Sequence, residues 1–221
     1  MNRLIATCLN VSLGRWENFW AAEQPCAVKL VSDEDILRKM VYSQANPVSS
    51  YLVSHGHKWP GVRTTPKDLL SEGIEVERPK GYFREDGKMP KKATLKLVRP
   101  PAYEHLSDEA FVELFDKELE EREEEIREQA KAKKIRFLGV RRILRQRPTD
   151  APRSKEPRRK LKPRVAAANK WRRIEALQRL KAFQAAYREA WLRWKQGFVD
   201  VVFPAGTYAL ARYAAVVCAP S

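Results

Sequence analysis

The sequence is poor in the residues that build disulfide or metal-bound scaffolds. Its three cysteines, Cys8, Cys26 and Cys218, are widely spaced and form no C-x-x-C pair, which argues against both a disulfide framework and a zinc site. Its three histidines include only one close pair, in His55-Gly56-His57. The glycine and the loop-like residues that follow do not favour a metal role for this pair.

Long apolar runs and hydrolase motifs are also missing. No apolar run approaches the roughly 18 residues that a membrane-spanning helix needs, and the first residues are too short an apolar stretch for a signal peptide. The sequence contains neither G-x-S-x-G nor H-E-x-x-H, so no serine or zinc hydrolase is indicated. We expect a cytoplasmic protein with no membrane partner.

Positive charge is abundant but unevenly distributed. The chain of 221 residues holds 43 Lys/Arg against 28 Asp/Glu, a net charge of +15. Residues 1–130 hold 19 Lys/Arg against 23 Asp/Glu, whereas residues 131–195 hold 23 against four. Such a field attracts phosphate backbones. A solvated basic face, or an anionic membrane surface, is the competing interpretation.

The first third of the sequence predicts two helices and a strand. Apolar spacing predicts a helix over 2–11, and alternation predicts a strand over 26–31. Ser32, followed three residues later by Asp35, is typical of a helix N-terminus. That helix is expected to end at Asn46, because Pro47 disfavours the α conformation in the residue before it.

The middle of the sequence predicts a hairpin and two helices. Strands over 74–76, continuing toward 82–83, and over 93–98 flank an Asp-Gly turn. Ser107 is expected to cap a helix with one apolar side and an acidic face. A short basic helix is expected over 140–146.

The last third predicts a charged connector and the longest helix. Residues 149–163 have the composition of a semi-extended linker. Apolar residues recur every three or four positions over 164–196, and Gly197 can end this helix. The same spacing assigns Trp171, Trp191 and Trp194 to the core. Residues 199–203 and 208–217 are expected to be short strands.

The basic region supplies the candidate nucleic-acid-binding residues. Cations bind phosphates, and tryptophan or arginine planes can stack on unpaired bases. The candidates are Lys155, Arg158, Arg159, Lys160, Lys162, Arg164, Lys170, Arg172 and Arg173.

Tyr42 is the candidate for catalytic chemistry. On a helix, Tyr42 and Asn46 project from one face, so a phenol and an amide could converge on one phosphate or metal. Taken alone, a tyrosine near a helix end is more often a packing residue.

The run KMVYSQANPVSSYLV, followed by HKWPGVRT, resembles the tyrosine segment of REP-associated tyrosine transposases, which are relatives of the single-tyrosine HUH transposases of insertion sequences. The earlier run LNVSLGRWENFWA, followed by AVKLV, is similar to the segment that precedes that tyrosine. The run from KPRVAAANKW to VVFPAGTY is similar to an extension in a subgroup of these proteins.

The resemblance implies an α+β fold, namely the carboxy-terminal part of a ferredoxin-like HUH domain followed by a hairpin and a basic helical extension. It implies DNA transposition by cleavage and joining of single-stranded or hairpin DNA. Tyr42 would be the nucleophile, and Mg²⁺ or Mn²⁺ bound by two histidines would polarise the phosphate. Asn46 corresponds to an amide near that metal.

One departure from the family is that no histidine precedes Tyr42. We therefore expect an amino-terminally truncated transposase, catalytically incompetent by itself, whose uncovered apolar faces favour association, for example as a homodimer. The expected division is 1–62 (truncated domain), 63–105 (loop and hairpin), 106–148 (helical), 149–163 (linker) and 164–221 (basic helix and tail). The alternatives are a non-enzymatic nucleic-acid-binding protein and a basic scaffold that binds an acidic protein.

Overall fold

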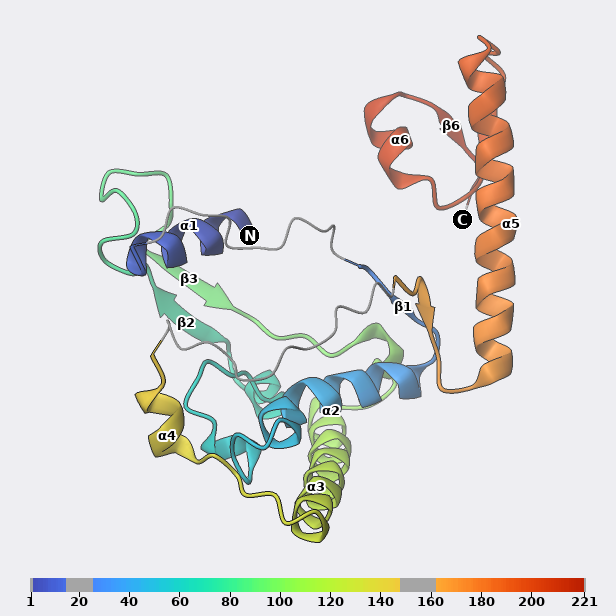
Figure 1. Ribbon diagram of the computed structural model, residues 1–221. Helices are drawn as coiled ribbons and strands as arrows, with labels where there is room; N and C mark the ends of the chain where they lie inside the picture. The colour runs from blue at the N-terminus through green and yellow to red at the C-terminus, as the bar shows by residue number, and fades with distance from the viewer. Residues whose placement is uncertain (1, 15–25, 148–161, 221) are drawn as a thin grey trace. The chain divides into compact units, whose positions relative to one another are not determined.

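The computed structural model describes residues 2–14, 26–147 and 162–220 of the chain. Its elements are α1 (Asn2–Ser12), β1 (Lys29–Leu30), α2 (Asp33–Ser49), η1 (Gly56–Lys58), η2 (Pro66–Leu70), β2 (Ile74–Glu77), β3 (Lys92–Leu95), η3 (Pro101–Tyr103), α3 (Asp108–Ala132), α4 (Val140–Arg145), β4 (Val165–Ala166), α5 (Lys170–Lys195), β5 (Val202–Phe203), α6 (Tyr208–Tyr213) and β6 (Val217–Cys218) (Figure 1). This mixture of helices and short strands is compatible with the expected α+β class.

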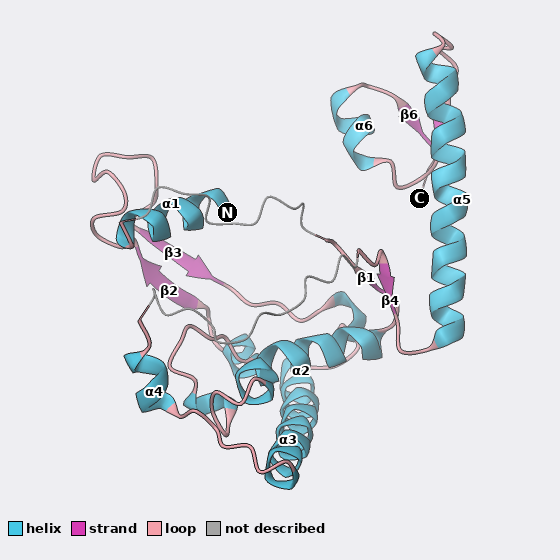
Figure 2. Cartoon of the chain, in the orientation of Figure 1, coloured by secondary structure: helices cyan, strands magenta, loops and turns pink. Residues whose placement is uncertain are grey.

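The chain divides into two compact units. The first comprises Met1–Pro25 and Ile36–Leu161, and the second comprises Cys26–Asp35 and Lys162–Ser221. The described strands form three separate two-stranded pairs (Figure 2). Within the described residues these pairs do not make a ferredoxin-like sheet.

The core of the first unit lies between α2 and α3. The residues buried there come mainly from one side of each helix: Leu37, Val41, Ala45 and Val48 from α2, and Phe111, Phe115, Leu119 and Ile126 from α3. Their three- and four-residue spacing places each set on one helical face. The predicted apolar side of α3 is confirmed. Ser107 caps this helix, and its Oγ accepts a hydrogen bond from the Ala110 backbone N–H.

The start of α2 was predicted correctly, and its end was not. Ser32 Oγ accepts from the Asp35 backbone N–H, while the Asp35 carboxylate accepts from Ser32, as in a capping box. The helix then continues through Pro47 to Ser49. Val48 is completely buried, and packing of this last turn outweighs the hydrogen bond that Pro47 cannot donate.

The remaining elements of the first unit largely follow the sequence. The strands β2 and β3 pair antiparallel, with Ile74 opposite Leu95. Residues 78–91 connect them, so the predicted Asp-Gly turn is a local feature of a longer loop, where Gly87 N–H donates to Arg84 O at 3.1 Å. The helix α4 begins after Gly139, as expected.

The second unit pairs segments that are far apart in the sequence. The strand β1 is shorter than the predicted 26–31 and lies parallel to β4. The Asp35 carboxylate accepts from the Ala168 backbone N–H at 2.8 Å. These contacts hold residues 164–169 outside the helix, so α5 begins at Lys170, after the Asn169 cap, and not at 164.

The tail packs against the second half of α5. Ala190, Val201 and Phe203 form a small core, and β5 pairs parallel with β6. The connection between these strands contains the helix α6, so the predicted strand over 208–217 is wrong for most of its length. A parallel pair needs a crossover connection, which a simple hairpin cannot supply.

None of the helices in the described part of the chain has the length and apolar character needed to cross a membrane.

Candidate functional site

Tyr42 lies on the solvent side of α2. The opposite side of the helix carries the buried residues Val41, Ala45 and Val48, whereas Tyr42 is 52% exposed and Asn46 is also exposed. Because the helix continues past Asn46, the two residues are one full turn apart on one face, as the spacing predicted. The phenol and the amide are therefore both accessible to a ligand.

Cations flank this tyrosine. The Lys39 ammonium lies 5.0 Å from the centroid of the Tyr42 ring, one turn earlier on the helix. Arg38 is its exposed neighbour. A phenol hydroxyl, an amide and an ammonium group on one helical face can together bind an anionic oxygen such as that of a phosphate. Sequence analysis missed Lys39, although its position three residues before Tyr42 was a usable signal.

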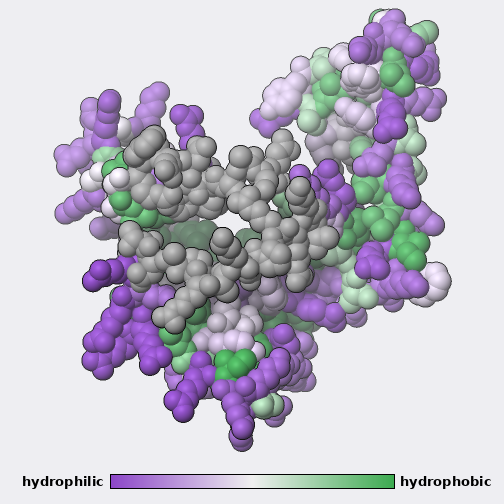
Figure 3. Space-filling model, in the orientation of Figure 1, coloured by the Kyte–Doolittle hydropathy of each residue, from purple (hydrophilic) through white to green (hydrophobic). Residues whose placement is uncertain are grey.

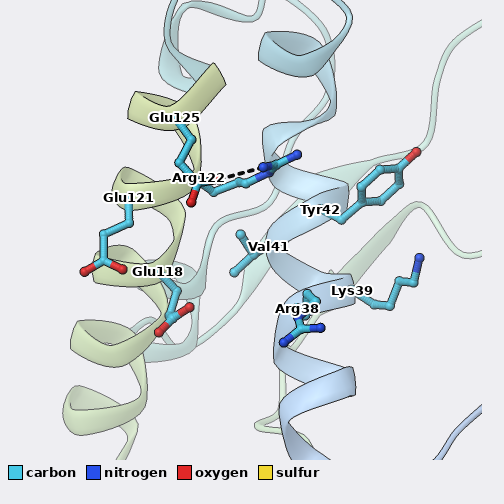
Figure 4. Close-up of a pocket in the computed structure, with 8 residues that line it drawn as sticks. All are labelled: Arg38, Lys39, Val41, Tyr42, Glu118, Glu121, Arg122 and Glu125. Carbon is cyan, nitrogen blue, oxygen red and sulfur yellow. Dashed lines mark hydrogen bonds and ion pairs between the residues drawn. The ribbon is translucent and has the colours of Figure 1, made fainter. Parts of the chain in front are cut away.

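A groove of about 450 Å³ runs between α2 and α3 beside this face. It is lined by Arg38, Lys39, Val41, Tyr42, Glu118, Glu121, Arg122 and Glu125. Figure 4 shows the Tyr42 hydroxyl pointing away from α3, while Arg122 bonds Glu125 at 2.7 Å. The carboxylates of α3 are thus not placed to accept the proton of this hydroxyl.

The donor set around Tyr42 does not fit the expected divalent cation. The nearest charged groups on its own helix are Lys39 and Arg38, which repel a metal ion. Within the residues that the structure describes, no group of three His, Cys, Asp or Glu side chains could hold one. Asn46 offers a single amide oxygen, and we derive no chemical step through a metal.

The histidine pair lies beside a buried polar network that the sequence did not reveal. Glu123 of α3 is buried, and its carboxylate accepts from the Gly56 backbone N–H at 3.0 Å. Arg127 lies 3.5 Å from the other carboxylate oxygen of Glu123 and donates to Ser54 O at 3.4 Å. This network fixes the loop after α2 against α3.

The two imidazoles of this loop lie close together near that network, with their planes tilted by 40°. The ring centroids of His55 and His57 are 5.3 Å apart, and Ser54 Oγ lies 3.0 Å from His55 Nδ1. Burial, followed by the charges of Arg127 and Lys58, lowers the pKa of His55 below 6.5. The lowered pKa favours the neutral form of His55.

The predicted DNA-binding residues are only partly described. Lys155, Arg158, Arg159 and Lys160 lie outside the described residues. The others, Lys162, Arg164, Lys170, Arg172 and Arg173, are all exposed and belong to the second unit.

The expected burial of the tryptophans is wrong for Trp171, which is 74% exposed. Trp194 is 39% exposed, and only Trp191 packs against the core of the second unit. The reason is geometric. Each three-residue step along a helix turns by about 300°, so apolar residues from Trp171 to Phe183 wind around α5 instead of sharing one face.

Comparison with models of known protein families, with curated proteins and with solved structures finds no match to this chain.

Proposed function

We propose that this chain is a transposase-type DNA-binding protein that holds a phosphate of single-stranded or hairpin DNA at the Tyr42 face of α2. The observation that carries the proposal is the exposure of Tyr42 and Asn46 on one face, with the Lys39 ammonium 5.0 Å from the phenol ring. A tyrosine kept only for packing would turn toward the core that Val41 and Val48 form.

The sequence around Tyr42 supports the same assignment. The segment 39–53 resembles the nucleophile segment of REP-associated tyrosine transposases, and the helix it predicts is present. By this resemblance Tyr42 stands at the nucleophile position of a DNA transposase that uses Mg²⁺ or Mn²⁺. The ferredoxin-like HUH domain remains part of the proposal. The proposal as a whole rests on the sequence of segment 39–53 and on the exposure of the Tyr42 and Asn46 side chains.

We infer that the chain binds DNA but does not cleave it unaided. A tyrosine hydroxyl is a weak nucleophile until a base or a metal activates it. No histidine precedes Tyr42 in the sequence, and none of the three α3 carboxylates drawn in Figure 4 faces its hydroxyl. Its surroundings can bind and orient a phosphate, and activation would require donors from elsewhere.

Binding and cleavage can be tested separately with labelled hairpin and single-stranded oligonucleotides. Lys39→Ala should weaken binding and lower the salt-dependence slope by about 1, as for loss of one phosphate contact. Lys67→Ala removes the same charge from a side chain that pairs with Asp116 at 3.2 Å, and it should leave the slope nearly unchanged. Equal effects of the two substitutions would argue against a phosphate at the Tyr42 face.

The cleavage test uses the same oligonucleotides with Mg²⁺ or Mn²⁺ and detects covalent protein–DNA adducts on denaturing gels. We expect no adduct with the chain alone. An adduct that Tyr42→Phe abolishes would show that the chain is a competent nuclease, whereas an adduct that survives Tyr42→Phe would exclude Tyr42 as the nucleophile.

A second candidate is non-enzymatic nucleic-acid binding through α5. This helix carries eight Lys/Arg against Glu175 and Glu189. Only Arg179 and Arg193 pair with acidic side chains in the described residues, and both pairs are solvent-exposed. Exposed cations of this kind bind phosphates with a strong salt dependence.

The α5 candidate predicts a salt-sensitive shift of any nucleic acid in a gel. Combined substitution of Arg172 and Arg173 by alanine should lower the salt slope by about 2. Binding that does not depend on salt, or no binding at low salt, would exclude this candidate.

A further inference from the structure

Trp171 is the most exposed tryptophan among the described residues, and it has no packing role that explains it. Its side chain is 74% exposed in the first turn of α5, whereas Trp191 of the same helix packs against the small core of the second unit. An aromatic ring left in water forgoes a large apolar contribution to stability, and such rings often serve as binding surfaces. Trp171 is therefore available to a ligand without any rearrangement.

The surroundings of this ring are strongly cationic. Lys170 places its ammonium 5.7 Å from the ring centroid, and the next two residues are Arg172 and Arg173, both exposed. The first acidic residue of α5 is Glu175, whose carboxylate is paired with Arg179 at 2.5 Å. Within the described residues none of these three cations has an ion pair, and an exposed aromatic ring beside them in sequence matches a ligand that has both an aromatic plane and phosphates.

Several other aromatic residues of α5 pack within the second unit, although Trp194 is 39% exposed. Tyr187 lies against Phe203, with ring centroids 5.6 Å apart, and stacks with Phe183. On the face of α5 that Figure 3 shows, hydrophilic side chains lie between the hydrophobic ones along the helix. A small flat group beside a phosphate backbone suits this surface better than a large apolar partner.

We propose that Trp171 is a stacking platform for an unpaired nucleobase, so that α5 selects single-stranded nucleic acid over duplex. This inference rests on the nucleic-acid binding by α5 described above, and it adds the substrate class. The bases of a duplex are stacked on each other, so their faces are not available to the ring. An unpaired base can stack on Trp171 while its flanking phosphates contact Lys170 and Arg172.

The test measures binding of the full chain to three fluorescent probes of equal charge by anisotropy. The probes are a thymidine 20-mer, a 20-mer of abasic sugar phosphates and a duplex matched in phosphate number. Wild type should bind the thymidine strand about 5- to 150-fold more tightly than the abasic strand, the range expected for stacking of one base on an aromatic side chain. Trp171→Ala and Trp171→Leu should abolish this preference, and Trp171→Phe should keep part of it.

The outcomes separate this inference from the function it rests on. A wild-type chain that binds none of the probes in a salt-dependent way overturns both. Salt-dependent binding that is the same in wild type and Trp171→Ala overturns the stacking role alone. An equal loss of affinity for the thymidine and abasic strands in Trp171→Ala also overturns it. Lys170→Ala is the charge control, and it should weaken binding to all three probes by similar factors. Circular dichroism of each variant should match wild type, because the Trp171 side chain is 74% exposed.

Discussion

Replacing Gly56 by alanine should destabilise the first unit, and the structure indicates how much. A Cβ at this position would lie 2.6 Å from Glu123 Oε1 and 3.2 Å from Arg63 Nη1. The carboxylate must then move away from the Gly56 N–H that it accepts from at 3.0 Å. Loss of a hydrogen bond to a charged group costs about 1.5–3 kcal/mol.

Part of that cost is offset in the unfolded chain. The backbone of Gly56 is in a region that alanine adopts without strain, so the substitution also restricts the unfolded state and stabilises by about 0.4–1 kcal/mol. The expected net loss in the free energy of unfolding is about 0.5–2.6 kcal/mol. Glu123→Ala should cost about 1–3 kcal/mol, because it leaves the buried Gly56 N–H without its acceptor, while Arg127 keeps its bonds to Glu124.

A double-mutant cycle tests this reasoning. In the Glu123→Ala background the obstructing carboxylate is gone, so Gly56→Ala should become neutral or slightly stabilising, with a coupling energy of about 2–3 kcal/mol. Urea titrations read by hydrogen exchange of peptides from α3 report on the first unit separately from the second. A cost of Gly56→Ala that is the same in both backgrounds would refute the proposed collision.

Three further perturbations follow from named contacts. The pKa of the His55 imidazole is lowered in the folded state, so the unfolded chain binds a proton at this imidazole at higher pH than the folded chain does. The free energy of unfolding should therefore fall as the pH drops from 6.5 through the lower folded pKa. In urea titrations, His55→Gln should show a weaker pH dependence. Asp35→Ala removes the capping box and the hydrogen bond from the Ala168 N–H. It should lower the free energy of unfolding by about 2–3 kcal/mol, and hydrogen exchange of the Ala168 amide should become faster. Ser107→Ala should cost about 1 kcal/mol in urea titrations, because the Ala110 N–H loses its acceptor; no change would contradict the capping role.

The features that the sequence predicted well depend on local chemistry. Ser32 with Asp35, Ser107 and Gly139 mark helix starts through contacts within three residues of each cap. The position of Tyr42 and Asn46 on one helical face follows from the helical period, whereas the exposure of that face is known only from the structure. Such signals can be interpreted without knowing what packs nearby.

The features that the sequence did not predict depend on distant residues. The end of α2 depends on the burial of Val48, which outweighs the preference set by Pro47. The parallel pairing of β1 with β4 joins segments more than 130 residues apart, and no local pattern specifies it. Likewise, nothing near Gly56 in the sequence indicates that Glu123 will bond to it.

The winding of apolar residues around α5 has a consequence for how its first half stays folded. Between Lys170 and Ala182 no side chain is fully buried, whereas Ala190 in the second half is. A free helix as short as this first half is marginal in water. Its order therefore depends on continuity with the second half of α5, which packs on the small core, and on the cap residue Asn169. The Asn169 side chain accepts hydrogen bonds from the backbone N–H groups of Trp171 and Arg172. Removing this one cap should let the end that carries Trp171 fray, and any ligand bound there would then have to supply the ordering that the amide oxygen now provides.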